Sequence, residues 1–317
     1  MVDQFTSVET CRTCGLPLSN DEFGSGGVCV RCISLSTTSE PDSAPAVSSE
    51  PFSLAPTVQV APLDPDHPRW GPFAGIAVWL SSVLAIIVIP VLAVFIWYFI
   101  QSARSKPLPN IVARDEMLEW LKSPTLLLVQ VLSTIVAHLL TIAVCWAVVT
   151  RLGKRPFWSS LGWNWAGRSV WYWLAFSAAV IVAILIASQG LSRVLPQSDT
   201  NSFSELLKSS QSVRVAITVL ATFTAPLVEE TVYRGILFSS LRRYLGLVAT
   251  VLTVTVMFTG VHVLQYWGAW VSVAGLTLLS FSLTVVRART KSILPCVLIH
   301  TLNNGFVSVL ILLNKAS

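Results

Sequence analysis

Long apolar runs separated by short polar connections dominate the chain from about Gly71 onward. A helix that spans a bilayer needs roughly 20 mostly apolar residues, and these runs are long enough to do so. They are continuous rather than alternating, which predicts helices and not the strands of a barrel. We expect seven spans, at about 74–100, 124–149, 170–191, 215–238, 246–264, 267–286 and 293–313.

Two shorter stretches between these runs also carry apolar or amphipathic character. The aromatic stretch at 156–165 is a candidate re-entrant or interfacial piece, which would raise the number of membrane elements to eight. The stretch at 203–212 is typical of a short interfacial helix. The predicted fold class is therefore an all-α polytopic transmembrane bundle.

Composition supports the same class and separates off the first 70 residues. Only 12% of the chain is charged, against about 25% in a soluble domain. Nine of the 16 acidic residues precede position 70. The sequence thus divides into a cysteine-bearing module at 1–34, a Ser/Pro/acidic linker at 35–70 that is expected to be disordered, and a transmembrane domain at 71–317.

Basic residues in the connections predict the orientation of the spans. The start of the chain lacks the basic and then apolar pattern of a signal peptide, so the N-terminus is expected in the cytosol. The even-numbered connections would then be cytosolic and carry nine basic residues, against seven spread over the longer odd-numbered ones, in agreement with the positive-inside rule. The nine are Arg151, Lys154, Arg155, Arg168, Arg242, Arg243, Arg287, Arg289 and Lys291. Because the net charge of +5 reflects this topology, no nucleic-acid partner is expected.

Four cysteines near the N-terminus form two CxxC knuckles, Cys11 with Cys14 and Cys29 with Cys32. Four thiolates at this spacing are typical of a closed, structural zinc site of the ribbon type. Two disulfides are the alternative, but they do not fit a cytosolic location. With all four positions filled, the zinc would have no open site for chemistry, and the module is expected to dock a protein partner.

The span at about 215–238 contains Glu229, Glu230 and Arg234 in its middle. Ionisable groups at the bilayer centre cost at least about 2.5–3.5 kcal/mol each on insertion scales, and they usually mark function. Glu230 and Arg234 are four residues apart, share a helix face and can pair. Glu229 points about 100° away. A structural ion pair explains Glu230 and Arg234, whereas Glu229 is a candidate general base.

Two later spans carry His262, and His300 with Asn304. His300 and Asn304 lie four apart on one face, and Asn303 is rotated away from it. Two histidines, a carboxylate and an amide can activate a water. The histidines and Asn304 can equally donate to a carbonyl oxyanion. Alternatively, Glu229, His262 and His300 can ligate a metal that keeps an open position.

Three further polar or sulfur-containing residues lie inside apolar spans. His138 is interpreted as a histidine satisfied by its packing environment, and Cys145 and Cys296 as small buried hydrophobes. None of the three is expected to carry chemistry.

The intramembrane residues, taken together, resemble the motifs of a known family. This is the CPBP family of CAAX-processing and bacteriocin-processing intramembrane proteases, also called Abi proteins. The resemblance covers roughly residues 125–313, without a departure at the motif positions, and excludes the N-terminal module and linker. It rests on three motifs in the right order: Glu229-Glu230-x-x-x-Arg234, Phe258-x-x-x-His262 and His300-x-x-x-Asn304.

The resemblance implies a role for each of these residues. Glu229 would be the base that activates the attacking water, and Glu230 and Arg234 would brace it or contact the substrate. His262 and His300 would polarise the water or bind a metal, zinc being the candidate, and Asn304 would help to hold the oxyanion. The family has been described both as metalloproteases and as glutamate proteases. The HExxH arrangement of zincins is absent.

The function predicted from the sequence is intramembrane peptide-bond hydrolysis of membrane-associated or lipidated, CAAX-type polypeptides. The resemblance to bacterial relatives implies a bacterial-type plasma membrane. One alternative is a non-catalytic bacteriocin self-immunity or binding protein on the same fold. The other is a proton-coupled transporter, which would require inverted repeats that the sequence lacks.

The cysteine module yields a direct prediction. The isolated segment 1–40 is expected to bind about one zinc ion per chain and to fold only when the metal is bound. Metal analysis of the purified segment measures this, and replacing all four cysteines by serine is the control. Less than about one zinc per chain would contradict the ribbon assignment.

Overall fold

The structure, a computed structural model, describes residues 64–104, 113–196 and 202–313, which lie within one compact unit. In these residues the elements are helices joined by turns. The cysteine module and the linker up to residue 63 lie outside the described residues. In chain order the elements are α2 (Pro72–Ala103), α3 (Arg114–Leu121), α4 (Pro124–Thr150), α5 (Phe157–Ser160), α6 (Val170–Leu191), α7 (Ser202–Ser209), α8 (Gln211–Val219), η2 (Leu220–Thr224), α9 (Ala225–Glu230), η3 (Thr231–Leu237), α10 (Phe238–Val263), α11 (Trp270–Thr290) and α12 (Leu294–Leu313).

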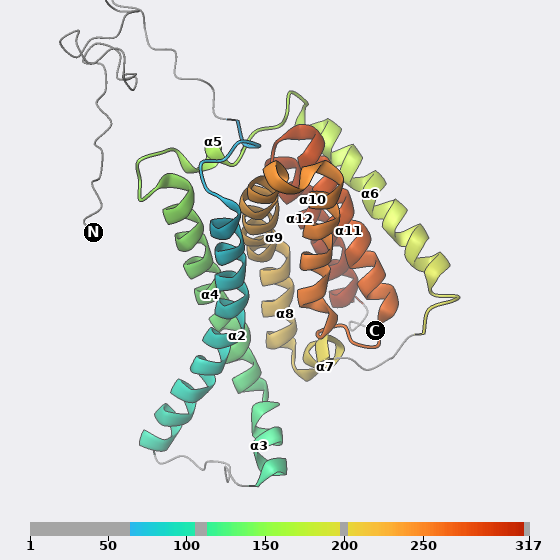
Figure 1. The fold of residues 1–317 in the computed structure, drawn as a ribbon. Coiled ribbons are helices and arrows are strands. Elements are labelled where there is room, and N and C mark those ends of the chain that lie inside the picture. The colour runs from blue at the N-terminus through green and yellow to red at the C-terminus, as the bar shows by residue number, and fades with distance from the viewer. Residues whose placement is uncertain (1–63, 105–112, 197–201, 314–317) are drawn as a thin grey trace, which may run out of the picture. The chain divides into compact units, whose positions relative to one another are not determined.

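The helices form a bundle around the α8–α9 column. Helices α2 and α4 pack against each other along one flank and diverge towards α3 (Figure 1). Helix α6 covers the opposite flank, where it packs on α11 and α12. The α8–α9 column, which continues into η3, lies between these groups and contacts α2, α4 and α12. All seven residues of η3, at the end of this column, are buried.

The number of spans differs from the seven expected. Six segments of the described chain are long and apolar enough to cross a membrane, because the fourth and fifth expected spans fall in one 53-residue segment, Gln211–Val263. A straight helix of that length would measure about 80 Å, far more than a bilayer core of about 30 Å. The segment is broken at Gly246, which has φ 74° and ψ 179°. Its two arms correspond to the two expected spans.

Apolar side chains cover the outside of the bundle. In the most apolar window of α2 only 6% of residues are buried, and in α6 only 11%. Large side chains such as Phe99, Ile186 and Val256 are about two-thirds exposed. A surface of this kind is unsuited to water but suited to hydrocarbon. The chain is thus a multi-pass membrane protein, as the sequence predicts.

Local signals explain where several helices begin and end. Pro124 opens α4, and Arg151 in the left-handed conformation closes it. Ser169 caps α6 by accepting from the Tyr172 N–H. Ser210 caps α8 in the same way, so the helix expected at 203–212 ends earlier, at Ser209.

The candidate eighth membrane element at 156–165 does not form a span. It contains α5, a helix of four residues, followed by turns. Ser292 donates to the carbonyl oxygens of Gly162 and Asn164, which ties this connection to the start of α12. Four helical residues are far too short to cross a bilayer.

The main core lies between α2, α4, η3 and α10. Phe238, Phe258 and Cys145 are fully buried in it. A second core, between α6, α11 and α12, contains Cys296. Both cysteines are free and buried, in agreement with the interpretation as small core residues.

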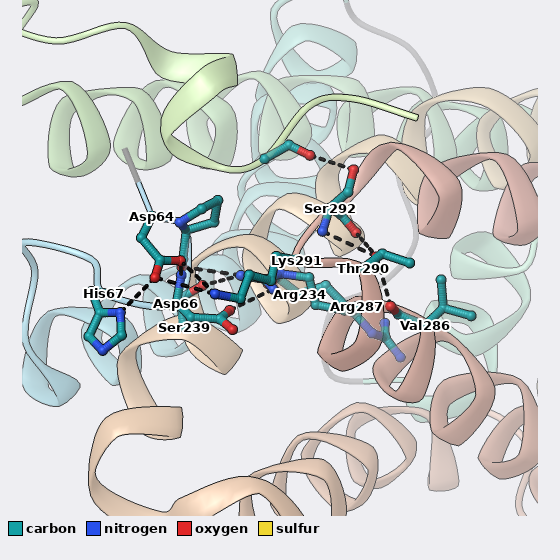
Figure 2. Close-up of polar contacts among 12 residues, drawn as sticks. Asp64, Asp66, His67, Arg234, Ser239, Val286, Arg287, Thr290, Lys291 and Ser292 are labelled. Carbon is teal, nitrogen blue, oxygen red and sulfur yellow. Dashed lines mark hydrogen bonds and ion pairs between the residues drawn. The ribbon is translucent and has the colours of Figure 1, made fainter. Parts of the chain in front are cut away.

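The last residues of the predicted linker pack against the bundle. We call residues 64–67 the strap, because they cross the end of α11 before α2 begins. Asp64 accepts from the Lys291 ammonium at 3.3 Å, contacts the His67 ring at 2.8 Å and accepts from the Asp66 backbone N–H at 3.0 Å (Figure 2). Burial raises the pKa of Asp64, but these three contacts outweigh burial and lower it to about 2.

This pKa predicts how the strap responds to acid. A carboxylate whose pKa is lowered on folding stabilises the fold above its unfolded pKa, about 3.9, and loses this effect as the pH falls through its folded pKa. Thermal unfolding of the purified protein is therefore expected at a higher temperature than that of Asp64→Asn at neutral pH. The difference should shrink between about pH 4 and pH 2. A difference that stays constant over this window would contradict the assignment.

Candidate active site

The two glutamates lie on a short α-helix between two π-helical turns. Helix α9 spans six residues, η2 precedes it and η3 follows it. π-Helical turns are rare and occur frequently at functional sites. Pro226 at the start of α9 accompanies the change of helix type. Such a backbone alters the directions in which successive side chains point.

Glu230 is fully buried and is the centre of a charged group. Its Oε1 accepts from Arg234 Nη1 at 2.9 Å and lies 2.8 Å from His300 Nδ1. The side chains of Glu230 and Arg234 have no exposed surface, and that of His300 is 2% exposed. The i,i+4 pairing expected from the sequence is confirmed, and His300 is a third member.

Arg234 is held by α11 as well as by Glu230. Its Nη2 donates to the backbone oxygen of Ser280 at 2.9 Å and to Ser280 Oγ at 2.8 Å. Its guanidinium lies 4.7 Å from the centre of the Phe258 ring. These additional contacts offset much of the free-energy cost of burying the Arg234 charge.

Glu229 has a different environment from its neighbour. Its side chain is 18% exposed, and its Oε2 lies 3.8 Å from His300 Nε2. This separation is too long for a direct hydrogen bond, but two such atoms can hold a water between them. The predicted divergence of the two glutamates therefore holds: one is buried in a charged group and the other faces a more open space.

The proton positions on both histidines follow from their acceptors. A carboxylate accepts only, so His300 Nδ1 carries the hydrogen that points at Glu230, which directs Nε2 towards Glu229. His262 Nδ1 lies 2.8 Å from the carbonyl oxygen of Phe258, which also accepts only. In the neutral ring, His262 Nε2 is therefore the free acceptor.

Phe258 connects the two histidines. Its ring centre lies 5.0 Å from that of His262 and 5.9 Å from that of His300. The aromatic side chain of the second motif thus separates His262 from the charged group and also receives the Arg234 cation. These contacts give a physical reason why the residue four positions before His262 is aromatic.

Asn304 lies next to η2. Its Nδ2 donates to the carbonyl oxygen of Ala221 at 2.9 Å, and its Oδ1 accepts from Asn303 Nδ2 at 3.3 Å. One N–H of the Asn304 amide is used in this way, and the second remains for another acceptor. The structure brings Glu230, Arg234 and His300 into direct contact and places Glu229 3.8 Å from His300. His262 lies against the Phe258 ring, and Asn304 lies on the η2 side.

The described residues do not fit a metal centre as they are placed. No group of three or more His, Cys, Asp or Glu side chains in them is arranged to hold a metal ion. The alternative set of Glu229, His262 and His300 stays a prediction, and no step below is routed through a metal. The zinc site predicted at Cys11, Cys14, Cys29 and Cys32 lies outside the described residues.

Sequence reasoning missed some contacts of the site. Ser280 holds Arg234 from a helix without any motif, and a serine in an apolar span gave no distinctive signal. His138 Nδ1 lies 3.0 Å from Thr224 Oγ1, directly before α9. The histidine interpreted as a packing residue is buried and has a partner, and it also borders the site.

A cavity of about 450 Å³ adjoins the Asn304 side of the site. It lies between α6, α7, α8, α11 and α12, and most of its lining is apolar. Ala221, Asn303 and Asn304 line the end next to η2, and Phe203, Leu207 and Tyr266 line another part. Its size is in the range that accommodates a small ligand or part of one.

The fold and site define a polytopic membrane protein with a carboxylate–histidine–arginine group in its interior. Residues 211–306 match the family model described as type II CAAX prenyl endopeptidase Rce1-like. The match runs from α8 into α12 and contains all three motifs. No curated protein and no solved structure matched the chain. The comparison supports CAAX-type intramembrane protease activity for this part of the chain.

The different burial of the two glutamates predicts different effects on stability. Glu230→Ala leaves Arg234 buried without its carboxylate and is expected to lower the free energy of unfolding by about 3–5 kcal/mol. Glu229→Ala removes a partly exposed group with one long contact and should change it by about 1 kcal/mol or less. Thermal unfolding in detergent micelles measures both. Equal destabilisation by the two substitutions would contradict the assignment of Glu230 to the buried group.

Proposed function

We propose that this chain is an intramembrane endopeptidase that hydrolyses a peptide bond near the lipidated C-terminus of CAAX-type polypeptides. The observation that carries the proposal is Glu229, a partly exposed carboxylate beside a fully buried charged group. It lies within a region that matches a CAAX endopeptidase family.

Glu229 is the general base in this mechanism. A water held between Glu229 Oε2 and His300 Nε2 transfers a proton to the carboxylate as its oxygen attacks the carbonyl carbon of the substrate. A new C–O bond forms, and the carbonyl π electrons move to the oxygen to give a tetrahedral oxyanion. The oxyanion electrons then re-form the C=O bond as the C–N bond breaks, and the leaving nitrogen takes the proton from Glu229. Atoms and charge balance without a further reactant.

The other polar groups hold and stabilise the reacting atoms. Glu230, through His300 Nδ1, fixes the ring so that Nε2 faces the water. The second N–H of Asn304 is a candidate donor to the oxyanion. His262, with Nδ1 engaged by Phe258, would present Nε2 to the substrate backbone or the leaving group. For both roles, the scissile bond of the bound substrate would lie between α10, which carries His262, and α12, which carries Asn304.

The cavity beside Asn304 suits the apolar part of such a substrate. A lipid attached near the scissile bond would enter between α6, α7 and α11 from the bilayer, and the peptide would then lie along the motif residues. Moving a CH₂ group from water into an apolar phase contributes about 0.8 kcal/mol, so the lipid anchor concentrates the substrate in the membrane that it shares with the enzyme. The membrane itself is a partner, because substrate and enzyme share it.

The orientation proposed for the enzyme places the strap and the basic ends of the helices in the cytosol. Arg151 donates to the Arg69 backbone oxygen, and Lys291 contacts Asp64, so these basic residues gather at one end of the bundle. This clustering agrees with the positive-inside rule. The cysteine module would lie on the same side and dock a protein partner.

The proposal is tested with a farnesylated CAAX peptide that carries a fluorophore and a quencher on either side of the scissile bond. The wild-type protein in liposomes is expected to cleave it, and Glu229→Gln should lower the rate by about 10²–10⁴-fold, the range for loss of a general base. Glu119→Gln, which removes an exposed carboxylate from α3, is the matched control and should cleave normally.

Unchanged cleavage by Glu229→Gln would refute the mechanism. Failure of the wild type to cleave, together with full protection of cells from a bacteriocin by both wild type and Glu229→Gln, would favour the non-catalytic binding alternative. Proton flux in the same liposomes that requires Glu229 would favour the transporter alternative.

A further inference from the structure

Arg287 on α11 is a fully buried arginine outside the three motifs. Its side chain has no exposed surface, and it is one of the largest fully buried side chains in the described chain. A guanidinium is effectively always charged, and burial of a charge is costly unless it is paired and hydrogen-bonded. The contacts that compensate for this burial therefore indicate what the residue holds in place.

Those contacts join three separate segments. Arg287 Nε donates to the backbone oxygen of Arg234 at 3.0 Å, and Nη2 donates to Ser239 Oγ at 2.9 Å. On the other side, Nη1 pairs with Asp66 Oδ1 at 2.8 Å, and Nη2 donates to the Pro65 oxygen at 3.2 Å. Figure 2 shows the strap, Arg287 and the Arg234 segment meeting at this point.

The Arg234 carbonyl belongs to the backbone that positions the candidate active site. Arg234 lies in η3, and its side chain pairs with Glu230, which in turn contacts His300. π-Helical turns form only in short pieces, so their geometry depends on external contacts. The Arg287 N–H that donates to the Arg234 carbonyl is such a contact, and it acts on the same residue whose side chain pairs with Glu230.

Asp66 provides the counter-charge that keeps Arg287 in this pose. Its side chain is 14% exposed, and it is the carboxylate paired with Arg287 in the described residues. Loss of that charge would leave the guanidinium partly uncompensated and favour its movement towards water. The donor to the Arg234 carbonyl would move with it.

We propose that Arg287 is a positioning residue for the Glu230–Arg234 pair, and that Asp66 in the strap holds Arg287 in position. Peptide-bond hydrolysis at Glu229 is assumed here, so the inference rests on the proposed function. The strap directly precedes α2 and follows the segment that carries the cysteine module. The geometry of η3 therefore depends on the contact between the strap, which lies before the first span, and Arg287.

The strap offers a matched pair of substitutions. Asp66→Asn removes the charge that faces Arg287 and keeps the size of the side chain. Asp64→Asn makes the same chemical change two residues earlier, and the Asn oxygen still accepts from the Asp66 N–H. The Asp64 side chain contacts Lys291 and His67, whereas the carboxylate on Arg287 is that of Asp66. Asp66→Glu, which restores the carboxylate, is the conservative variant.

Cleavage of the farnesylated reporter peptide provides the first measurement. Asp66→Asn is expected to lower kcat by about tenfold with KM nearly unchanged, because a small misplacement of catalytic groups affects the chemical step and not the binding of the lipid. Asp64→Asn should retain the kcat of the wild type, and Asp66→Glu should recover part of the loss. All variants are compared at a temperature where unfolding measurements show them fully folded.

Backbone hydrogen exchange provides a second measurement that does not require proteolysis. Amides in residues 231–238 are expected to exchange several-fold faster in Asp66→Asn than in the wild type or Asp64→Asn. If the wild type cleaves no reporter, the proposed function fails, while this measurement still decides whether Asp66 and Arg287 hold η3.

Three outcomes would overturn the proposal. The first is unchanged kcat and unchanged exchange in Asp66→Asn. The second is an equal loss of kcat in Asp64→Asn and Asp66→Asn, which would show only general loosening of the strap. The third is slower cleavage explained by KM alone, which would place the effect on substrate binding.

Discussion

The buried group of Glu230, Arg234 and His300 is the interaction on which the interior of this protein depends. Two charges without exposed surface lie in a bundle whose outside is apolar, and they are compatible with that environment because each is the other's partner. The same Glu230 oxygen contacts His300, so the pairing also fixes a ring on α12. A structural ion pair thus determines the direction of the histidine nitrogen that faces Glu229.

The adjacent residues Glu229 and Glu230 have different environments and therefore different chemistry. Glu230 gains its stability from contacts that leave it little freedom, whereas Glu229 has one long contact and some exposure. The cost of desolvating the pair is offset by Ser280 and by the face of Phe258. The buried pair is itself not fully hydrogen-bonded, since Glu230 Oε2 and Arg234 Nε have no hydrogen-bond partner in the described residues. Its remaining contacts still fix the backbone and the His300 ring beside Glu229, which keeps the freedom to bind a water.

The parts of this account that the sequence predicted are those that follow from local spacing. Four residues between Glu230 and Arg234 place them on one face of a helix, and a rotation of about 100° separates Glu229 from them. The apolar runs predicted a membrane bundle because composition over 20 residues is a strong signal. The number of separate segments differs because Gly246 turns the chain between two helical arms that follow each other without a connecting loop.

Contacts between distant segments could not be predicted in this way. Ser280, Arg287 and Asp66 have no periodicity or motif that relates them to Arg234, and a polar linker composition favours disorder for the strap. Only the tertiary structure brings a residue 221 positions away against Arg287. The two π-helical turns around α9 likewise have no sequence signature, since they reflect packing rather than propensity. The cysteine module stays a prediction.

The most direct test of the central claim is an experimental structure of the protein with an uncleavable, farnesylated peptide in which a reduced bond replaces the scissile amide. The account predicts that the Glu229 carboxylate faces the reduced bond, with His300 Nε2 beside it, while Glu230 remains paired with Arg234. A structure in which Glu230 has left Arg234 and faces the reduced bond, with Glu229 turned away from the peptide, would contradict it.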